Sequence, residues 1–263
     1  MVVLGILGWL EYARLSAAGG FPFGTSILIL GSLSICLFGL VALRDLGSLD
    51  LLAALTIAAF APAIAILVRR GEVGPFGILQ SATFGVMYLG IPVFSAMVLR
   101  EVSGQVSQIW FTEFASNISR LGAAAPLGLA LVLATIITVW LSDTVAYLTG
   151  SAVGRRKLAP HISPGKTIEG SAAGLAAAII SGAVTVTYLG AGSWEMGVLL
   201  GAGAGVSGQL GDLTESLMKR QVGVKDSGAL IPGHGGILDR IDALLFAFPA
   251  VLLTVYALNW FER

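Results

Sequence analysis

An all-α, polytopic integral membrane protein with about eight transmembrane helices is the fold class that the sequence predicts. Apolar residues make up 56% of the 263 residues, and charged residues make up only 11%. An average soluble domain has roughly 25% charged residues, so this composition is typical of a membrane protein. The apolar residues also fall into runs of about 20, the length at which a helix crosses the hydrocarbon of a bilayer.

The apolar runs give the expected spans in chain order. They cover residues 2–18, 26–43, 49–68, 76–99, 126–150, 171–190, 194–211 and 241–260. Glu11 and Arg14 interrupt the first run. It lacks the preceding basic residues and the small-residue cleavage site of a signal peptide, so we interpret it as a membrane helix.

The stretch 101–125 is polar, with Trp110 and Phe111 inside it. Because Trp favours the headgroup zone of a bilayer, this stretch predicts an interfacial element instead of a span. The chain then divides into two regions. Residues 1–125 hold the N-terminal transmembrane helices and the interfacial segment, and residues 126–263 form a C-terminal transmembrane region with polar loops at 151–170 and 212–240.

Positive charge is distributed unevenly between the two sides of this topology. Eleven of the 15 Lys and Arg residues fall on one side and four on the other. The positive-inside rule places the richer side in the cytoplasm. Both polar loops lie on that side, and the two termini are expected on the other.

Charge and cysteine content exclude two other classes of protein. The formal net charge is zero, which leaves no broad basic field for nucleic acid. The single Cys36 excludes a disulfide framework within one chain. The glycine-rich run 201–205 lacks the GxxxxGK[ST] pattern of a nucleotide-binding loop, and its small residues indicate close helix packing instead.

Asp143 is an acidic residue deep in the predicted span 126–150. A charged side chain facing lipid there would cost several kcal/mol, so Asp143 is expected to face the protein interior or a watery cavity. Thr144 and Tyr147 give it polar neighbours. Its role is either that of a site residue or that of a cap on a broken helix.

Two further pairs of acids sit at the ends of predicted spans. Asp212 and Glu215 are one helical turn apart, as are Asp239 and Asp242, so the members of each pair can project to the same side. Mg²⁺ is bound by one or two carboxylates and by substrate phosphates. Acids in the first turn of a helix also complement its dipole, so for Asp239 and Asp242 a helix-start role competes with metal binding.

Basic residues alternate with these acids. Lys166, Lys219, Arg220, Lys225 and Arg240 are candidates for binding phosphate. The alternative is that they are positive-inside anchors, which is the stronger interpretation for residues 155–157. His234 lies between glycines, without a second His or Cys nearby, and this excludes a zinc pattern. It is either a phosphate or ribose contact or a simple turn residue.

A long motif covers these residues. Residues 216–242, SLMKRQVGVKDSGALIPGHGGILDRID, resemble the complete signature of the phosphatidate cytidylyltransferase (CDP-diacylglycerol synthase) family. The signature reads S-x-x-K-R-x4-K-D-x-G-x2-I-P-x-H-G-G-x-x-D-R-x-D. A second segment, DTVAY at 143–147 followed by ISPGKTIEG at 162–170, is similar to another recurring segment of that family. Residues 1–125 add only generic spans.

The resemblance implies an integral membrane nucleotidyltransferase of phospholipid biosynthesis that converts CTP and phosphatidate to CDP-diacylglycerol and pyrophosphate. It implies a requirement for Mg²⁺, often with K⁺, a homodimer, and a polar cavity open to the cytoplasm. Asp212 and Asp239 would be the metal ligands. The remaining site residues that it implies are Asp143, Lys166, Lys219, Arg220, Lys225, Asp226, His234, Arg240 and Asp242, of which Lys166, Lys219, Arg220 and His234 would hold the nucleotide.

Other functions remain open at this point. A CTP-using polyprenol or phytol kinase would share the basic loops and Mg²⁺, but not the intact signature. A transporter would suit Asp143 and the glycine-interrupted helices, yet the polar groups crowd one face. A CDP-alcohol phosphotransferase would carry D-G-x2-A-R-x8-G-x3-D-x3-D, which does not occur. The bacterial plasma membrane is the simplest location.

Overall fold

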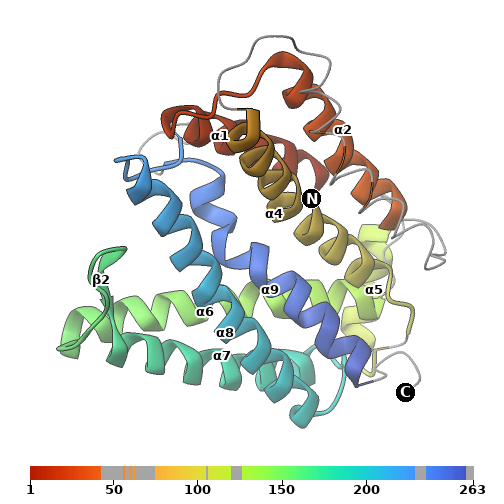
Figure 1. Ribbon diagram of the computed structural model, residues 1–263. Helices are drawn as coiled ribbons and strands as arrows, with labels where there is room; N and C mark the ends of the chain where they lie inside the picture. The colour runs from red at the N-terminus through yellow and green to blue at the C-terminus, as the bar shows by residue number, and fades with distance from the viewer. Residues whose placement is uncertain are drawn as a thin grey trace. The chain divides into compact units, whose positions relative to one another are not determined.

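The computed structural model describes residues 1–42, 56, 60, 62, 75–104, 106–119, 126–228 and 235–258. The predicted span 49–68 lies almost wholly outside these residues, and so does His234. The helices are α1 (Val2–Ala18), α2 (Thr25–Ala42), α4 (Pro75–Glu101), α5 (Ile109–Ser119), α6 (Pro126–Val153), α7 (Ile168–Tyr188), α8 (Trp194–Gln221) and α9 (Leu238–Ala257) (Figure 1). Two short strands, β1 (Lys157–Ala159) and β2 (Ser163–Thr167), complete the described elements.

The predicted fold class is confirmed. Each predicted span other than 49–68 coincides with a helix. Within the described part of the chain, α4, α6, α7 and α9 are the four helices long and apolar enough to cross a membrane. The protein is therefore a polytopic helical membrane protein. With 11 residues, α5 is too short to cross, which agrees with the interfacial element expected at 101–125.

Helix α8 extends ten residues beyond the predicted end of its span and includes much of the predicted loop 212–240. Residues 212–221 read DLTESLMKRQ, and most of these residues favour a helix. Lys219 and Arg220 lie in its last turn, where positive charge complements the helix dipole. Helix α9 begins at Leu238, so Asp239 and Arg240 are also helical.

The predicted loop 151–170 contains an antiparallel hairpin, with Lys157 paired to Thr167 and Ala159 to Ser163. The hairpin is tied to the start of α7. The Glu169 carboxylate accepts the backbone N–H groups of Arg155 and Arg156, and the Thr167 hydroxyl caps α7 by accepting Gly170 N–H at 3.1 Å. These local contacts hold Lys166 at the entrance to α7.

The chain forms two compact units, and each joins segments that are distant in sequence. The first unit is Met1–Met97 with Leu217–Ile241, and the second is Val98–Ser216 with Asp242–Arg263. The unit boundaries fall inside α4, α8 and α9. The units therefore follow neither chain order nor the sequence-based division at residue 125.

Helix α1 supplies much of the core of the first unit. Trp9 is fully buried, donates its indole N–H to Leu28 O at 3.2 Å and stacks on Phe23. Tyr12 is also buried, and its hydroxyl lies 2.9 Å from Ser81 O on α4. A Cβ on Gly85 would collide with the Tyr12 ring, so α1 and α4 approach closely there.

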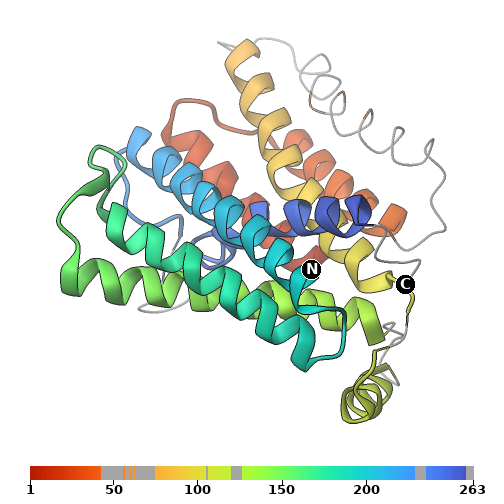
Figure 2. The ribbon, with the colours of Figure 1, turned by 90° about the horizontal axis from the view of Figure 1, so that it is seen from below.

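In the second unit, α6 and α7 run side by side, with the hairpin joining them at one end (Figures 1 and 2). Small residues allow α7 and α8 to pack backbone to backbone. A Cβ on Gly182 would lie 2.5 Å from Gly197 O and 2.7 Å from the Cα of Gly201. This is the packing role predicted for the glycine-rich helices.

Candidate active site

A cavity of about 350 Å³ with a mixed polar and apolar lining opens in the second unit among α6, the hairpin, the start of α7 and the second half of α8. Its volume lies in the range of small-molecule sites. Its polar lining includes Asp143 and Tyr147 from α6, Ser163 and Lys166 from β2, Thr167, Ser171 from α7, and Gln209 and Asp212 from α8. The structure thus brings together three predicted site residues, Asp143, Lys166 and Asp212.

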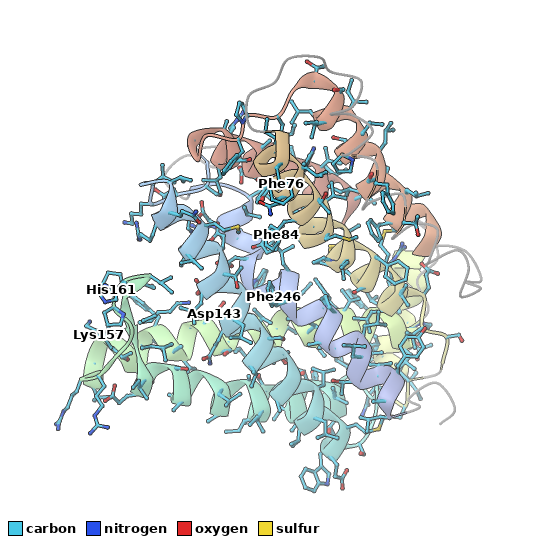
Figure 3. All side chains as sticks on the ribbon, in the orientation of Figure 1. Phe76, Phe84, Asp143, Lys157, His161 and Phe246 are labelled. Carbon is cyan, nitrogen blue, oxygen red and sulfur yellow. The ribbon has the colours of Figure 1, made fainter. Side chains whose placement is uncertain are left out.

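Asp143 lies on the wall of this cavity, on a helix that is continuous from Pro126 to Val153. The continuity excludes the role of cap on a broken helix. Its side chain is solvent-accessible, as expected for a carboxylate that faces a watery hollow. Figure 3 places Asp143 on α6, with Lys157 and His161 on the hairpin at the end of the helix pair.

Lys166 and Asp212 form an ion pair inside the cavity, with 2.5 Å between Lys166 Nζ and Asp212 Oδ2. About a quarter of each side chain is exposed, so the pair is in contact with water. The other oxygen of Asp212 accepts the Ser216 hydroxyl at 3.3 Å. One cation and two carboxylates therefore lie in one hollow, which suits a ligand that carries both phosphate and metal.

Gln209 and Ser171 join α8 to α7 across the floor of the cavity. The Ser171 hydroxyl donates to Gln209 Oε1, and Gln209 Nε2 donates to Ser171 O at 2.9 Å. On the next turns, the Ser142 hydroxyl of α6 donates to Gly174 O at 3.0 Å. Sequence reasoning missed Gln209 and Ser171. The available signal was an amide side chain inside the apolar, glycine-rich run 194–211.

A second polar cluster lies in the first unit, between α8 and α9. It involves the described residues 227–228 and 235–237, which we call the α8–α9 turn. Asp239 Oδ1 accepts Lys219 Nζ at 2.6 Å. Its Oδ2 accepts Gly236 N–H at 2.8 Å, Ser227 N–H at 2.9 Å and the Ser227 hydroxyl at 3.0 Å. Asp239 therefore stabilises the start of α9, and this supports the helix-start role weighed for it.

Glu11, on α1, completes this cluster, and the sequence interpretation missed it. Its side chain is almost fully buried, at 3% exposure. Its carboxylate accepts Leu238 N–H at 2.8 Å, Ile237 N–H at 3.0 Å and the Ser227 hydroxyl at 3.2 Å. The sequence does show Glu11 as an acidic residue within an apolar run. We interpreted it only as an interruption of the predicted membrane span.

Asp212, Glu215 and Asp242 belong to the second unit and Asp239 belongs to the first, so the metal site implied for Asp212 and Asp239 stays a prediction. Glu215 is completely buried and does not line the cavity with Asp212, because three residues along a helix also turn the side chain by about 60°. Asp242 accepts the N–H of Ala243 at 2.7 Å. Over the described ranges, no three His, Cys, Asp or Glu side chains are grouped to hold a metal.

Four other predicted site residues lie at the surface, and His234 lies outside the described residues. Arg220 donates to Val224 O at 3.2 Å within the turn after α8. Lys225, Asp226 and Arg240 are exposed. These side chains are accessible to a charged ligand, and their roles stay predictions.

These observations define the class of protein. It is a polytopic helical membrane protein with a water-accessible cavity, and its described residues include the carboxylate–lysine pairs Asp212–Lys166 and Asp239–Lys219. The chain belongs to the cytidylyltransferase family, whose profile matches residues 1–258. This confirms the family predicted from the signature.

Curated relatives align over parts of the chain. A phosphatidate cytidylyltransferase of Synechocystis sp. is 47% identical over 134 residues, which is 51% of this chain and 45% of that protein. One of Haemophilus influenzae is 46% identical over 127 residues, 46% of this chain and 44% of that protein. One of Staphylococcus aureus is 48% identical over 124 residues, 46% of this chain and 47% of that protein. The chain thus spans about half the length of the curated relatives it matches.

Proposed function

We propose that this protein is a phosphatidate cytidylyltransferase, which converts CTP and phosphatidate to CDP-diacylglycerol and pyrophosphate. The observation that carries the proposal is that Asp143, Lys166 and Asp212 line one cavity. Family membership and the names of the relatives support the same reaction. We place the reaction at the cytoplasmic face of a bacterial inner membrane, because most of the Lys and Arg residues fall on that side of the predicted topology.

The chemistry requires two polyanions to meet. A phosphate oxygen of phosphatidate attacks the α-phosphorus of CTP, a new P–O bond forms, and the bond to the leaving pyrophosphate breaks. The nucleophile is already an anion, so the protein needs no strong base. Catalysis of this kind depends on positioning and on neutralising charge.

The two lysines held by carboxylates suit that task. Asp212 keeps the Lys166 ammonium at the cavity, and Asp239 holds the Lys219 ammonium beside the α8–α9 turn. An ammonium that is already fixed in place loses less entropy when it binds a phosphate oxygen. We propose that Lys166 and Lys219 bind substrate phosphates. Arg220, Lys225 and Arg240 are exposed and are further candidates for binding phosphate.

The cavity residues fit Mg²⁺, which prefers carboxylate and other hard oxygen ligands and shares its shell with substrate phosphate. Asp143 and Asp212 would hold it, and the ion would supply charge neutralisation at the phosphates. Both oxygens of Asp212 and both oxygens of Asp239 already have partners in the structure. For Asp212 to bind metal, Lys166 would have to move to a substrate phosphate, and for Asp239 to bind metal, Lys219 would have to do the same. The pairing of Asp239 with Asp212 around one ion stays a prediction.

The apolar helices have a role beyond anchoring. The acyl chains of phosphatidate stay in the hydrocarbon while its headgroup reaches the polar cavity, so α6 and α7 are also part of lipid binding. We propose no nucleic acid partner. The homodimer and the use of K⁺ implied by the resemblance are further proposals.

A product assay tests the function directly. Purified protein in detergent micelles is given CTP, phosphatidate and Mg²⁺, and lipid products and pyrophosphate are measured. We expect equimolar CDP-diacylglycerol and pyrophosphate. Parallel reactions contain a polyprenol in place of phosphatidate, and formation of polyprenyl phosphate with CDP would support the kinase instead.

A further inference from the structure

We propose that Glu11 is a positioning residue for the reaction: it anchors the α8–α9 turn and, through that turn, sets Asp239 and Lys219. The catalytic part of this inference rests on the proposed function. The anchoring part rests on contacts within the first unit alone.

Glu11 acts as a helix cap supplied by a distant part of the chain. The first N–H groups of a helix lack partners within it, and a Ser, Thr, Asp or Asn just before the helix commonly accepts them. Here the preceding residues are Gly236 and Ile237, which offer no such side chain. Glu11 instead accepts the N–H groups of Ile237 and Leu238, across sequence separations of 226 and 227 residues.

Two glycines of the signature make room for this carboxylate. A Cβ on Gly228 would lie 2.7 Å from Glu11 Oε1, and a Cβ on Gly236 would collide with Glu11 Oε2 and the Ser227 hydroxyl. Any larger residue at either position would displace the carboxylate or the turn. Glycine is thus required at positions 228 and 236 because Glu11 occupies the space that a Cβ would fill.

Ser227 connects Glu11 to Asp239, because its hydroxyl contacts both carboxylates. Its hydroxyl oxygen lies 3.2 Å from Glu11 Oε2 and 3.0 Å from Asp239 Oδ2. Asp239 in turn holds Lys219 at 2.6 Å. A shift of Ser227 would therefore move the Asp239 carboxylate and, with it, the Lys219 ammonium that we assign to substrate phosphate. Outer partners of this kind typically change activity by roughly 10–100-fold when removed.

Glu11→Gln provides the test, because glutamine has nearly the same size but replaces one acceptor oxygen with an N–H donor. The Ile237 and Leu238 N–H groups, which the two carboxylate oxygens accept separately, then face one acceptor oxygen. We expect hydrogen–deuterium exchange at the Ile237 and Leu238 amides to accelerate by about tenfold or more, while exchange in α4 stays unchanged. We also expect kcat to fall roughly 10–100-fold, with the KM for CTP within about threefold of wild type.

Arg14→Gln is the matched control, because Arg14 is an exposed residue on the same helix. It should leave both exchange and kcat at wild-type values. Ser227→Ala is a second variant, for the case in which Glu11→Gln fails to fold. It removes only the shared hydroxyl, and it should lower kcat with the KM for CTP little changed.

Unchanged exchange at Ile237 and Leu238 in folded Glu11→Gln would overturn the anchor. Faster exchange with wild-type kcat would overturn the positioning role, as would wild-type kcat in Ser227→Ala. If the wild-type protein makes no CDP-diacylglycerol, the proposed function fails, and the catalytic part of this inference fails with it. The exchange comparison still decides whether Glu11 anchors the turn.

Discussion

Lys166 Nζ lies 2.5 Å from Asp212 Oδ2, and this ion pair connects the β-hairpin to α8 within the cavity of the second unit. The two residues come from separate predicted loops, at 151–170 and 212–240. Their contact means that the lysine we propose for binding phosphate is held by the carboxylate we propose for binding metal.

Replacing Lys166 should therefore affect the nucleotide directly. We expect Lys166→Ala to lower kcat/KM for CTP by roughly 100-fold, the scale seen when one charge-stabilising donor is lost. Arg155→Ala is the control, since Arg155 is an exposed residue at the base of the same hairpin. Steady-state kinetics with CTP as the varied substrate measure both. Equal, small effects would return Lys166 to the class of positive-inside anchors.

Asp143 should be needed for turnover but not for folding. Its side chain projects from the continuous helix α6 and lines the cavity. We therefore expect Asp143→Asn to leave the packing of α6 intact and to remove one negative charge. We expect turnover to fall roughly 100-fold with an unchanged melting temperature in detergent. Glu113→Gln, on α5, removes a carboxylate of the same unit as a control. Near-normal turnover of Asp143→Asn would remove this residue from the site.

Asp239 should be needed for both turnover and folding stability. Asp239→Asn replaces an oxygen that faces Lys219 or three donors at the turn, and each lost bond to a buried donor costs about 1–3 kcal/mol. We expect loss of turnover together with a lower melting temperature, but with the protein still inserted in the membrane. A variant that keeps wild-type rates would show that Asp239 serves neither metal nor substrate.

Chelation tests the metal. We expect EDTA to abolish CDP-diacylglycerol formation, added Mg²⁺ to restore it and K⁺ to raise it further. The measurement is product formation against free Mg²⁺ concentration for wild type and for Asp212→Asn, which should need more Mg²⁺ for half-maximal rate. Activity that persists in EDTA would contradict a metal at Asp143 and Asp212.

The space around Glu11 yields a stability prediction. Gly236→Ala would place a methyl group against Glu11 Oε2 and the Ser227 hydroxyl, and overpacking of this kind costs about 1–3 kcal/mol. Gly165→Ala is the comparison, since nothing lies within 4 Å of a Cβ there. Thermal unfolding in detergent should separate the two variants. Equal melting temperatures would contradict the close packing of the turn on α1.

Composition and hydropathy were enough to predict the membrane class and most of the helices, because spans must satisfy length and apolarity at once. The ends of the helices were harder to predict from the sequence. Polar residues 212–221 are good helix formers, yet hydropathy reports only where apolar residues stop. The hairpin is too short for an alternation pattern to reveal it, and its stability comes from contacts with Thr167 and Glu169 at the start of α7.

The candidate site was predicted in part for a similar reason. Asp143, Lys166 and Asp212 stand out as charges in or beside apolar spans. The second family-like segment, 143–147 with 162–170, contains Asp143 and Lys166. Gln209 does not stand out, because a single amide has little effect on hydropathy. The role of Glu11 depends on partners more than 200 residues away, and no local pattern in one sequence reports such a contact.

The large sequence separation between Glu11 and its hydrogen-bond partners has a consequence for biosynthesis. The hydrogen bonds to Ile237 and Leu238 join residues 226 and 227 positions apart. At about 5–20 residues per second, a ribosome needs roughly 10–50 s to make the intervening chain. During that interval α1 carries an acid whose backbone donors have not yet been made. The contact between α1 and the start of α9 can therefore form only after residues 237 and 238 have been synthesised.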